Sequence, residues 1–239
     1  MGKAKVIAID GPCGSGKSTV AQDVAARIGA VYVDTGAMYR AIGWYLQEKG
    51  VSFEEGDGLQ VALKTIKMSY GVSPEILVTI NGKDLTKKIR EKQVSQLASI
   101  ASKLPSVRTF LLEFQRDFAR QNLCVMEGRD IGTVIFPDAF CKIYLEASPE
   151  VRAQRRLLQL KTEGSAKDSA LTYEWVLEDI RVRDERDMNR EIAPLKKAAD
   201  ALLLETTSLD KDEVVDKLVL MAKEQAKRFG LEFGNGKVA

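Results

Sequence analysis

The 239-residue sequence contains no histidine. This absence excludes a Ser-His-Asp triad, a Cys-His dyad and a histidine-ligated zinc site. Any catalysis must therefore use lysine, arginine, carboxylate and hydroxyl side chains, together with a bound metal ion. Phosphoryl transfer suits this set, because it depends on positioning and on neutralising charge more than on a histidine base.

Cysteine is scarce, and long apolar runs are missing. The three cysteines, Cys13, Cys124 and Cys141, have no metal-site spacing, and an odd number suits reduced thiols in a cytosol. No apolar run approaches the ~20 residues of a transmembrane helix, and the N-terminus, MGKAKV, lacks the apolar core of a signal peptide. The net charge of only +2 argues against a general nucleic-acid or membrane surface. We therefore expect a cytoplasmic protein with neither kind of partner.

Residues 6–19, which read VIAIDGPCGSGKST, carry the strongest local signal. Residues 6–9 have the length and β-branched content of a buried strand, and a helical pattern starts at Lys17. Between them lies the P-loop spacing G-x-x-x-x-G-K-S, in which backbone N–H groups bind phosphates, Lys17 reaches the β- and γ-phosphates and Ser18 can ligate Mg²⁺. The residues predicted to bind the nucleotide phosphates are Gly11, Pro12, Cys13, Gly14, Ser15, Gly16, Lys17, Ser18 and Thr19.

The order of the expected elements predicts an α/β fold. A strand, the P-loop, a helix and a second strand at residues 31–33 form the beginning of a parallel sheet. Further buried strands are expected at residues 123–126, 141–147 and 201–204, with helices between them. Asp210 and Glu213 resemble a capping box for a last helix. The fold class is therefore a P-loop NTPase-type parallel sheet of five strands flanked by helices.

Two segments interrupt this alternation. Residues 51–90 contain short strand patterns around the tight-turn pair Asn81-Gly82, which predicts a small antiparallel insert. Residues 161–171 are polar with small side chains and are expected to form a mobile loop. We therefore divide the chain into three parts and a tail that we expect to be frayed: a core (1–34, 101–155 and 191–230), an insert (35–100), a lid (156–190) and the tail (231–239).

Charged segments follow three of the expected strands, at the edge where α/β sheets bind ligands. They are residues 34–40, residues 127–130 and the segments after the strand at 141–147. Guanidinium groups bind phosphate through two hydrogen bonds, so such a cluster predicts an anion site. The arginines supplied by these segments are Arg40, Arg129, Arg152, Arg155, Arg156, Arg181, Arg183, Arg186 and Arg190.

One helix face within this set has two interpretations. Arg183, Arg186, Asp187 and Arg190 lie at positions i, i+3, i+4 and i+7 of the helix expected at residues 172–190. The face could be a solvated one with Asp179–Arg183 and Arg183–Asp187 ion pairs, each worth a few tenths of a kcal/mol. Because the face is positive and flanks a lid-like loop, we favour a role in phosphate binding and lid closure.

Carboxylates near the expected phosphate site are candidates for the metal. Glu127 and Asp130 follow a buried strand, where a Walker B-type acid would help to hold Mg²⁺, although they could instead be loop carboxylates neutralised by Arg129. Asp34 competes for the same role, and the sequence does not rank these candidates.

Thr35, Tyr39 and Arg40 form a second candidate anion-binding group, with a hydroxyl, a phenol and a guanidinium within about one helical turn. The alternative reading makes Thr35 the N-cap of a helix and Tyr39 a half-buried aromatic side chain.

Three motifs resemble those of bacterial cytidylate kinases. They are DTGAMYR at residues 34–40, EGRDIGTVIFP at 127–137 and RDERDMNR at 183–190, and the resemblance extends from residue 6 to about residue 228. It implies a nucleoside monophosphate kinase with a parallel-sheet core, an enlarged NMP-binding insert and a short lid. Such an enzyme transfers the γ-phosphoryl group of ATP to CMP or dCMP with Mg²⁺, which would make ATP the ligand of the P-loop.

The resemblance also implies roles for individual residues. Arg183 and Asp187 would contact the ribose, and Arg190 would lie near the transferred phosphoryl group. Thr35 stands where many members have serine, so the hydroxyl is kept and a methyl group is added. Glu127 stands where aspartate is more usual, so the charge is kept on a side chain that is longer by one methylene. The residues implied to hold the CMP phosphate are Thr35, Tyr39, Arg40 and Arg129, and those implied to read cytosine are Ser99, Arg108 and Asp130. The catalytic set would be Lys17, Arg129, Arg183 and Arg190.

Other functions remain alternatives at this point. A GTPase switch would need an N-K-x-D guanine-reading motif, which is absent. A kinase acting on UMP or on a metabolite hydroxyl would differ in its acceptor, and the hydroxyl kinase would need a base such as Asp34 or Asp130. A pure ATP-binding scaffold would bind without turnover. We expect the chain to act as a monomer on small-molecule substrates.

Overall fold

The computed structural model describes residues 3–73, 75–162 and 172–231. The chain divides into two compact units, the first formed by Met1–Val33 with Ala119–Ala239 and the second by Asp34–Phe118. The second unit includes most of the helix that starts at Pro105, whereas the sequence analysis assigns this helix to the core. The division of the chain into core, insert and lid therefore stays a prediction.

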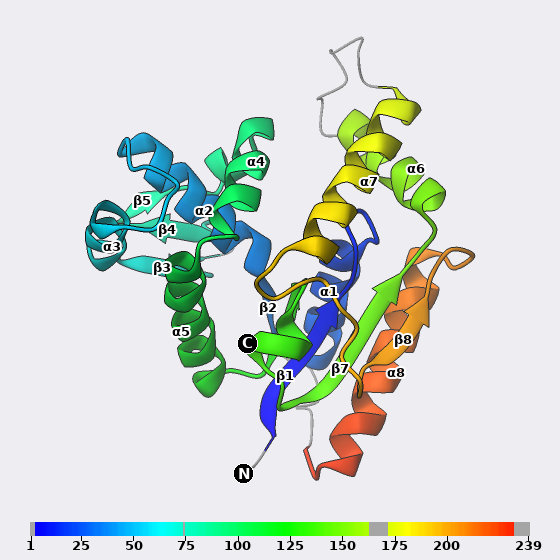
Figure 1. Ribbon diagram of the computed structural model, residues 1–239. Helices are drawn as coiled ribbons and strands as arrows, with labels where there is room; N and C mark the ends of the chain where they lie inside the picture. Colours follow the sequence, from blue (N-terminus) through cyan, green and yellow to red (C-terminus); the bar gives the residue numbers. More distant parts are fainter. Residues whose placement is uncertain (1–2, 74, 163–171, 232–239) are drawn as a thin grey trace. The chain divides into compact units, whose positions relative to one another are not determined.

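The first unit contains a five-stranded sheet in the order β2-β6-β1-β7-β8 (Figure 1). Strand β1 pairs in parallel with β6 on one side and with β7 on the other, and β7 pairs in parallel with β8. The predicted P-loop NTPase-type sheet is therefore confirmed. Its strands are β1 (Ala4–Asp10), β2 (Val31–Asp34), β6 (Cys124–Gly128), β7 (Ala139–Glu146) and β8 (Leu202–Glu205).

Apolar side chains of this sheet form the main core with two helices, α1 (Lys17–Ile28) and α8 (Lys211–Arg228). Burial of such side chains from both layers is the main stabilising contribution in an α/β domain. Gly29 ends α1 in the left-handed conformation, and both hydrogen bonds of the predicted capping box start α8. Two further helices, α6 (Pro149–Thr162) and α7 (Tyr173–Asn189), lie side by side in the same unit (Figure 1).

The second unit combines helices with a small sheet in the order β3-β4-β5. The strand pairs are antiparallel, and the β4–β5 turn holds Asn81 at φ 52° and Gly82 at φ 78°, so the predicted antiparallel insert is confirmed. Helices α2 and α4 approach closely, because a Cβ on Gly43 would lie 2.9 Å from Leu97. The elements are α2 (Thr35–Glu48), α3 (Asp57–Lys64), β3 (Met68–Tyr70), β4 (Val78–Ile80), β5 (Lys83–Asp84), the 3₁₀ helix η1 (Lys88–Arg90), α4 (Lys92–Ala101) and α5 (Pro105–Gln121).

Two local features differ from the sequence-based predictions. The N-cap of α2 is Asp34, whose carboxylate accepts the Ala37 N–H, so the alternative reading of Thr35 as the cap is wrong. A π-helical segment, η2 (Ile131–Ile135), follows β6 and was not predicted. Most of the loop predicted at residues 161–171, and the tail predicted after residue 231, lie outside the described residues.

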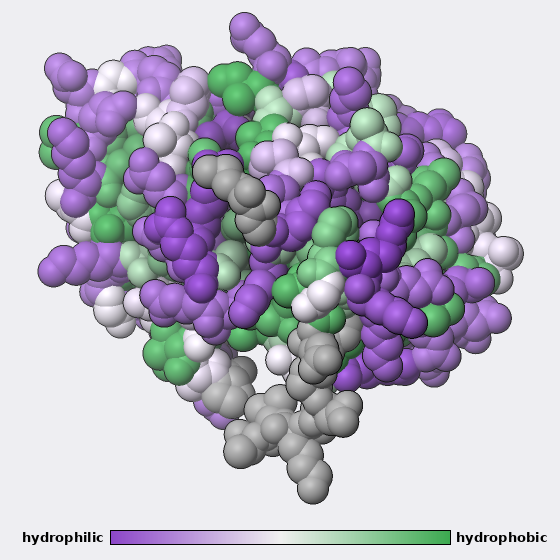
Figure 2. All heavy atoms as spheres, turned by 90° about the horizontal axis from the view of Figure 1, so that it is seen from below, coloured by the Kyte–Doolittle hydropathy of each residue, from purple (hydrophilic) through white to green (hydrophobic). Residues whose placement is uncertain are grey.

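No helix in the described ranges is both long and apolar enough to cross a membrane. In the view of Figure 2, hydrophobic residues are interspersed with hydrophilic ones, as on most protein surfaces.

Candidate functional site

The P-loop follows β1 directly, and its glycines are required by geometry. Gly11 passes so close to β7 that a Cβ there would lie 2.1 Å from the carbonyl oxygen of Leu145. Gly14 and Gly16 have φ values of 73° and 87°, in the left-handed region that L side chains avoid. The loop therefore adopts a backbone that only glycine permits at these positions, and α1 begins at its end.

Lys17 is a buried cation whose hydrogen bonds go to a carbonyl and a hydroxyl oxygen. It is 4% exposed, and its Nζ donates to the carbonyl of Pro12 at 2.7 Å and to the Ser15 hydroxyl at 3.2 Å. Burial, followed by the nearby charge of Arg129, lowers the pKa of Lys17 to about 7. The negative charge of a bound phosphate would offset both effects, so the geometry favours a polyanion beside this lysine.

Three of the predicted arginines surround the P-loop side of the first unit. Arg183 donates from Nη1 to the Cys13 thiol at 3.6 Å, and Arg129 donates from Nε to Asp187 at 2.8 Å. Arg190 Nη2 lies 3.4 Å from Asp130. Burial disfavours the charged form of Arg129, but Asp187, Cys13 and Glu127 together outweigh that effect, and the pKa of Arg129 is raised. These guanidinium groups remain charged at any physiological pH.

Of the two ion pairs predicted along α7, the structure contains Asp179–Arg183, whereas Asp187 pairs with Arg129. Arg183 pairs with Asp179 at 3.3 Å, as expected for a solvated helix face. Asp187, however, turns to Arg129 on the loop after β6, and Arg190 to Asp130 on the same loop. The face therefore connects the helix with the segment that follows β6, which is not what a purely solvated face would do.

The other arginines that we had grouped around the anion site have different roles. Arg152 is buried against Asp184, and Arg155 donates to the backbone carbonyls of Thr206 and Leu209. The rest lie near the surface: Arg156 bonds to Gln159, Arg181 pairs with Glu150 and Arg186 is exposed. Arg155, Arg156 and Arg181 therefore have partners outside the P-loop, whereas Arg152 also contacts Cys13 within it.

A carboxylate that the sequence analysis missed lies at the end of β1. Asp10 accepts the N–H groups of Ile131 at 2.9 Å and Gly132 at 2.7 Å, and so holds the start of η2. Burial raises the pKa of Asp10 to about 6, against the lowering effect of these two N–H groups. Asp10 precedes the P-loop at a strand end, so the rule that pointed to Asp34 and Glu127 could also have found it.

The described residues offer oxygen ligands to a metal but no ready-made cage, since no cluster of three or more Cys, Asp or Glu residues occurs among them. Glu127 is 5% exposed and accepts the Tyr32 hydroxyl at 2.9 Å, and Ser18 is exposed at the start of α1. Asp34 caps α2 and pairs with Arg40 at 2.7 Å. A small number of oxygen donors from the protein suits Mg²⁺, because this ion usually keeps several water molecules and binds substrate phosphates as its other ligands.

The second unit carries the remaining predicted residues. Thr35 is buried in the first turn of α2, and the Arg108 guanidinium lies 6.0 Å from the centre of the Tyr39 ring. Arg108 also donates to the carbonyl of Ser102, whose hydroxyl donates to the carbonyl of Ser99. Tyr39, Arg108 and Ser99 are therefore linked within this unit, while Arg40 is held by Asp34.

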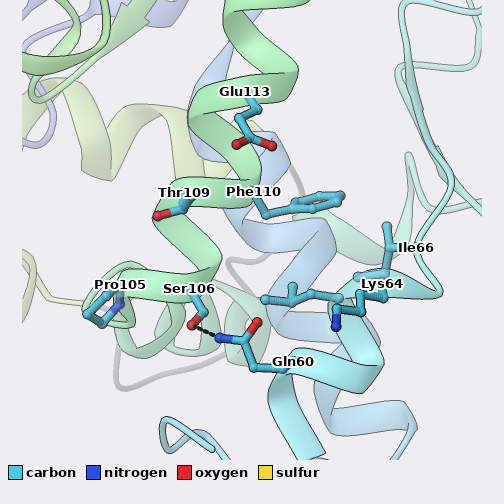
Figure 3. A pocket seen from close by; sticks show the side chains of 9 residues that line it. Gln60, Lys64, Ile66, Pro105, Ser106, Thr109, Phe110 and Glu113 are labelled. Carbon is cyan, nitrogen blue, oxygen red and sulfur yellow. Dashed lines mark hydrogen bonds between the residues drawn. The ribbon is translucent and has the colours of Figure 1, made fainter. Parts of the chain in front are cut away.

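A pocket of about 410 Å³ opens between α3 and α5 in the second unit (Figure 3). Its walls include Leu63 and Phe110, with the amide of Gln60 donating to the Ser106 hydroxyl at its edge. None of the predicted site residues lines this pocket.

Comparison with known proteins decides the family. The family model described as cytidylate kinase matches residues 7–224. The chain belongs to the cytidylate kinase family. A cytidylate kinase of Thermosipho melanesiensis is 43% identical over 221 residues, which cover 92% of this chain and 98% of that protein. A cytidylate kinase of Bacillus licheniformis is 44% identical over 230 residues, covering 95% of this chain and all of that protein.

A third relative, a cytidylate kinase of Carboxydothermus hydrogenoformans, is 45% identical over 215 residues, covering 89% of this chain and 95% of that protein. The match to the cytidylate kinase model spans every predicted site residue, from Gly11 to Arg190. The resemblance inferred from three short motifs is therefore confirmed.

Proposed function

We propose that this protein transfers the γ-phosphoryl group of ATP to CMP or dCMP, giving ADP and CDP or dCDP. One observation carries the proposal beyond family membership. Lys17 is buried at the end of the P-loop, and burial, followed by the charge of Arg129, lowers the pKa of Lys17 to about 7. Arg129 is paired with Asp187, so the strained charge is that of Lys17, and a phosphate bound beside it would relieve that strain, which suits a site for phosphate-bearing substrates.

The donor half of the site is the P-loop. Its N–H groups and the N-terminus of α1 would bind the phosphates of ATP, with Lys17 at the β- and γ-phosphates. Ser18 would hold Mg²⁺ directly, and we favour Glu127 over Asp34 for assistance through water, because Asp34 caps α2 and pairs with Arg40. When bound, Mg²⁺ would neutralise charge on the transferring phosphates.

The acceptor half would bind the monophosphate through hydroxyl and guanidinium groups. We propose Thr35, Tyr39, Arg40 and Arg129 for the phosphate, as the family resemblance implies. Arg40 and Arg129 each already bind a carboxylate, Asp34 and Asp187 respectively. An arginine oriented by one carboxylate still has donors left for a phosphate, because its guanidinium carries five N–H groups.

The base and the sugar would be recognised by polar groups. We propose Ser99, Arg108 and Asp130 for the cytosine edge, and Arg183 with Asp187 for the ribose. Arg190, which lies beside Asp130, would stabilise the transferring phosphoryl group together with Lys17.

This chemistry needs no strong base. A monophosphate is largely dianionic near neutral pH, since its second pKa is about 6, so it can attack without losing a proton to the protein. A kinase acting on a hydroxyl group would need a base, and the two candidates are engaged otherwise: Asp34 with Arg40 and Asp130 with Arg190. The acceptor is therefore better assigned as a phosphate than as a hydroxyl.

A coupled assay of ADP formation with a panel of acceptors tests the proposal. We expect slow ADP release with ATP alone, a large stimulation by CMP and dCMP, and a smaller one by UMP. Lys17→Met should abolish the stimulation. If no pyrimidine monophosphate raises the rate above that with ATP alone, the proposal is wrong. A cytoplasmic location, a monomeric state and the lack of nucleic-acid or membrane partners remain predictions beside it.

A further inference from the structure

The backbone of Cys13, in the middle of the P-loop, is held on both sides by side chains from two helices. Its N–H donates to Oδ1 of Asp184 in α7 at 3.0 Å, and its carbonyl accepts from Nη1 of Arg152 in α6 at 2.8 Å. Asp184 and Arg152 also bind each other at 2.5 Å. The two side chains therefore clamp the two peptide groups that flank Cys13 in the phosphate-binding loop.

Both side chains are committed to this arrangement. Their side-chain exposures are 5% for Arg152 and 10% for Asp184. Arg152 further donates from Nε to the carbonyl of Ala147, at the end of β7. Buried charges of this kind are retained only when paired and hydrogen-bonded, and here each of the two has the other as its counter-ion.

The clamp joins the P-loop to the helix that carries the proposed acceptor residues. Arg183, next to Asp184 in α7, reaches the thiol of the same Cys13. A Cβ on the following Gly14 would meet the backbone of Arg152 at 3.3 Å, so the loop also packs directly against α6. A shift of α7 along its axis would therefore disturb the loop at Cys13.

We infer that Asp184 and Arg152 are positioning residues that fix the backbone at Cys13, and with it the phosphate-facing N–H groups of the P-loop, in register with Arg183 of α7. This inference rests on the proposed function. We assign both as positioning and not as catalytic residues, because Asp184 accepts from Cys13 and from Arg152, and Arg152 also binds the carbonyls of Cys13 and Ala147. Their effect on the reaction would pass through the loop and the helix.

The experiment compares breaking the pair with replacing it. Asp184→Leu and Arg152→Met each leave one buried charge without its partner, so both should lower the melting temperature. The double variant Arg152→Met/Asp184→Leu removes both charges, and apolar replacement of a buried ion pair is often neutral or stabilising, so its melting temperature should return towards that of the wild type.

Activity should not return with stability. In the double variant the Cys13 N–H still lacks its acceptor, so we expect the ATP dissociation constant and the KM for ATP to rise about tenfold or more, the equivalent of one lost hydrogen bond to a charged group. The KM for CMP should change less than about twofold. The matched control is Arg181→Gln, which breaks an exposed ion pair between the same two helices, Arg181–Glu150, and should leave both constants unchanged.

The outcomes separate the two proposals. If the double variant regains wild-type ATP affinity along with its stability, the pair is structural only and the inference is wrong. ATP affinity is measured by calorimetry without any acceptor, so this result does not depend on which nucleotide accepts the phosphoryl group. A wild-type protein that CMP fails to stimulate would instead refute the proposed function, while the ATP affinities of the variants would still decide the role of the clamp.

Discussion

ATP binding should draw a proton from solution onto Lys17. Burial and Arg129 lower the pKa of this lysine to about 7 in the ligand-free protein, so most Lys17 side chains are neutral at pH 8. The phosphates of ATP would place negative charge beside Nζ and restore the charged form. Binding and protonation are thus linked, and ATP affinity should weaken as pH rises above 7.

The size of the effect follows from the pKa. A group with a pKa of about 7 is about 90% neutral at pH 8, half neutral at pH 7 and about 10% neutral at pH 6. If Lys17 is fully protonated in the complex, the binding of each ATP should take up about 0.9 proton from solution at pH 8 and about 0.1 proton at pH 6. The terminal phosphate of MgATP is already ionised at pH 8, so it should release almost none.

Calorimetry in several buffers measures this quantity directly. The binding enthalpy of MgATP at pH 8 is plotted against the ionisation enthalpy of each buffer, and the slope is the number of protons taken up. Lys142 provides the matched control, because it is also a buried lysine but is paired with Asp200 at 2.8 Å. Lys142→Arg should leave the slope unchanged, and Lys17→Arg should reduce it to near zero wherever binding is still measurable.

A slope near zero for the wild-type protein at pH 8 would refute this reasoning. It would mean that Lys17 is already fully charged before ATP binds, and that the site pays no desolvation cost for the cation. The burial of Lys17 and its repulsion by Arg129, on which the assignment of the site depends, would then be too weak to matter.

Three further predictions test other parts of the structure. Gly11→Ala should lower the free energy of unfolding by about 3 kcal/mol or more, because its Cβ would collide with the backbone of Leu145. Asp187→Ala should raise the KM for CMP about tenfold, whereas Arg190→Ala should lower kcat about a hundredfold, as expected for loss of a group that acts in the transition state. The stability advantage of the wild type over Asp10→Asn should fall by up to about 3 kcal/mol as pH rises from about 4 to about 6, because the folded state holds the proton of Asp10 more tightly than the unfolded state.

Each of these predictions has a control and a contrary result. Gly58→Ala should not destabilise, since that helical glycine has open space around it, and an equally stable Gly11→Ala would show that the loop can move away from β7. Arg181→Ala changes an exposed residue of α7 and should leave the kinetic constants alone. Unchanged kinetic constants in both Asp187→Ala and Arg190→Ala would favour the interpretation of this helix face as a solvated surface. A pH-independent difference for Asp10→Asn would show that Asp10 titrates normally.

Much of the fold was predictable because its signals are local. Apolar runs located the strands, the turn at Asn81-Gly82 located the antiparallel insert, and Asp210 with Glu213 located the start of the last helix. Each of these patterns depends on residues within about four positions of one another, where periodicity and capping rules apply. The P-loop is predictable for the same reason.

The partners of charged residues were not predictable. The sequence could suggest Asp179–Arg183, four residues apart, but Arg129 and its partner Asp187 are 58 positions apart and Arg152 and Asp184 are 32 apart. Only the fold brings these together, so an arginine that stabilises the loop could not be distinguished from one available to a substrate. Asp34 illustrates the same limit at short range, because either it or Thr35 could have capped α2.

The transfer of labelled phosphate tests the central claim most directly. ATP labelled at its γ-phosphate is incubated with CMP and Mg²⁺, and the products are separated by chromatography. The account predicts that the label appears in the β-phosphate of CDP, in amounts equal to the ADP formed, and that Lys17→Met abolishes it. Label recovered only as inorganic phosphate, or in no cytidine nucleotide at all, would contradict the assignment of this site to CMP phosphorylation.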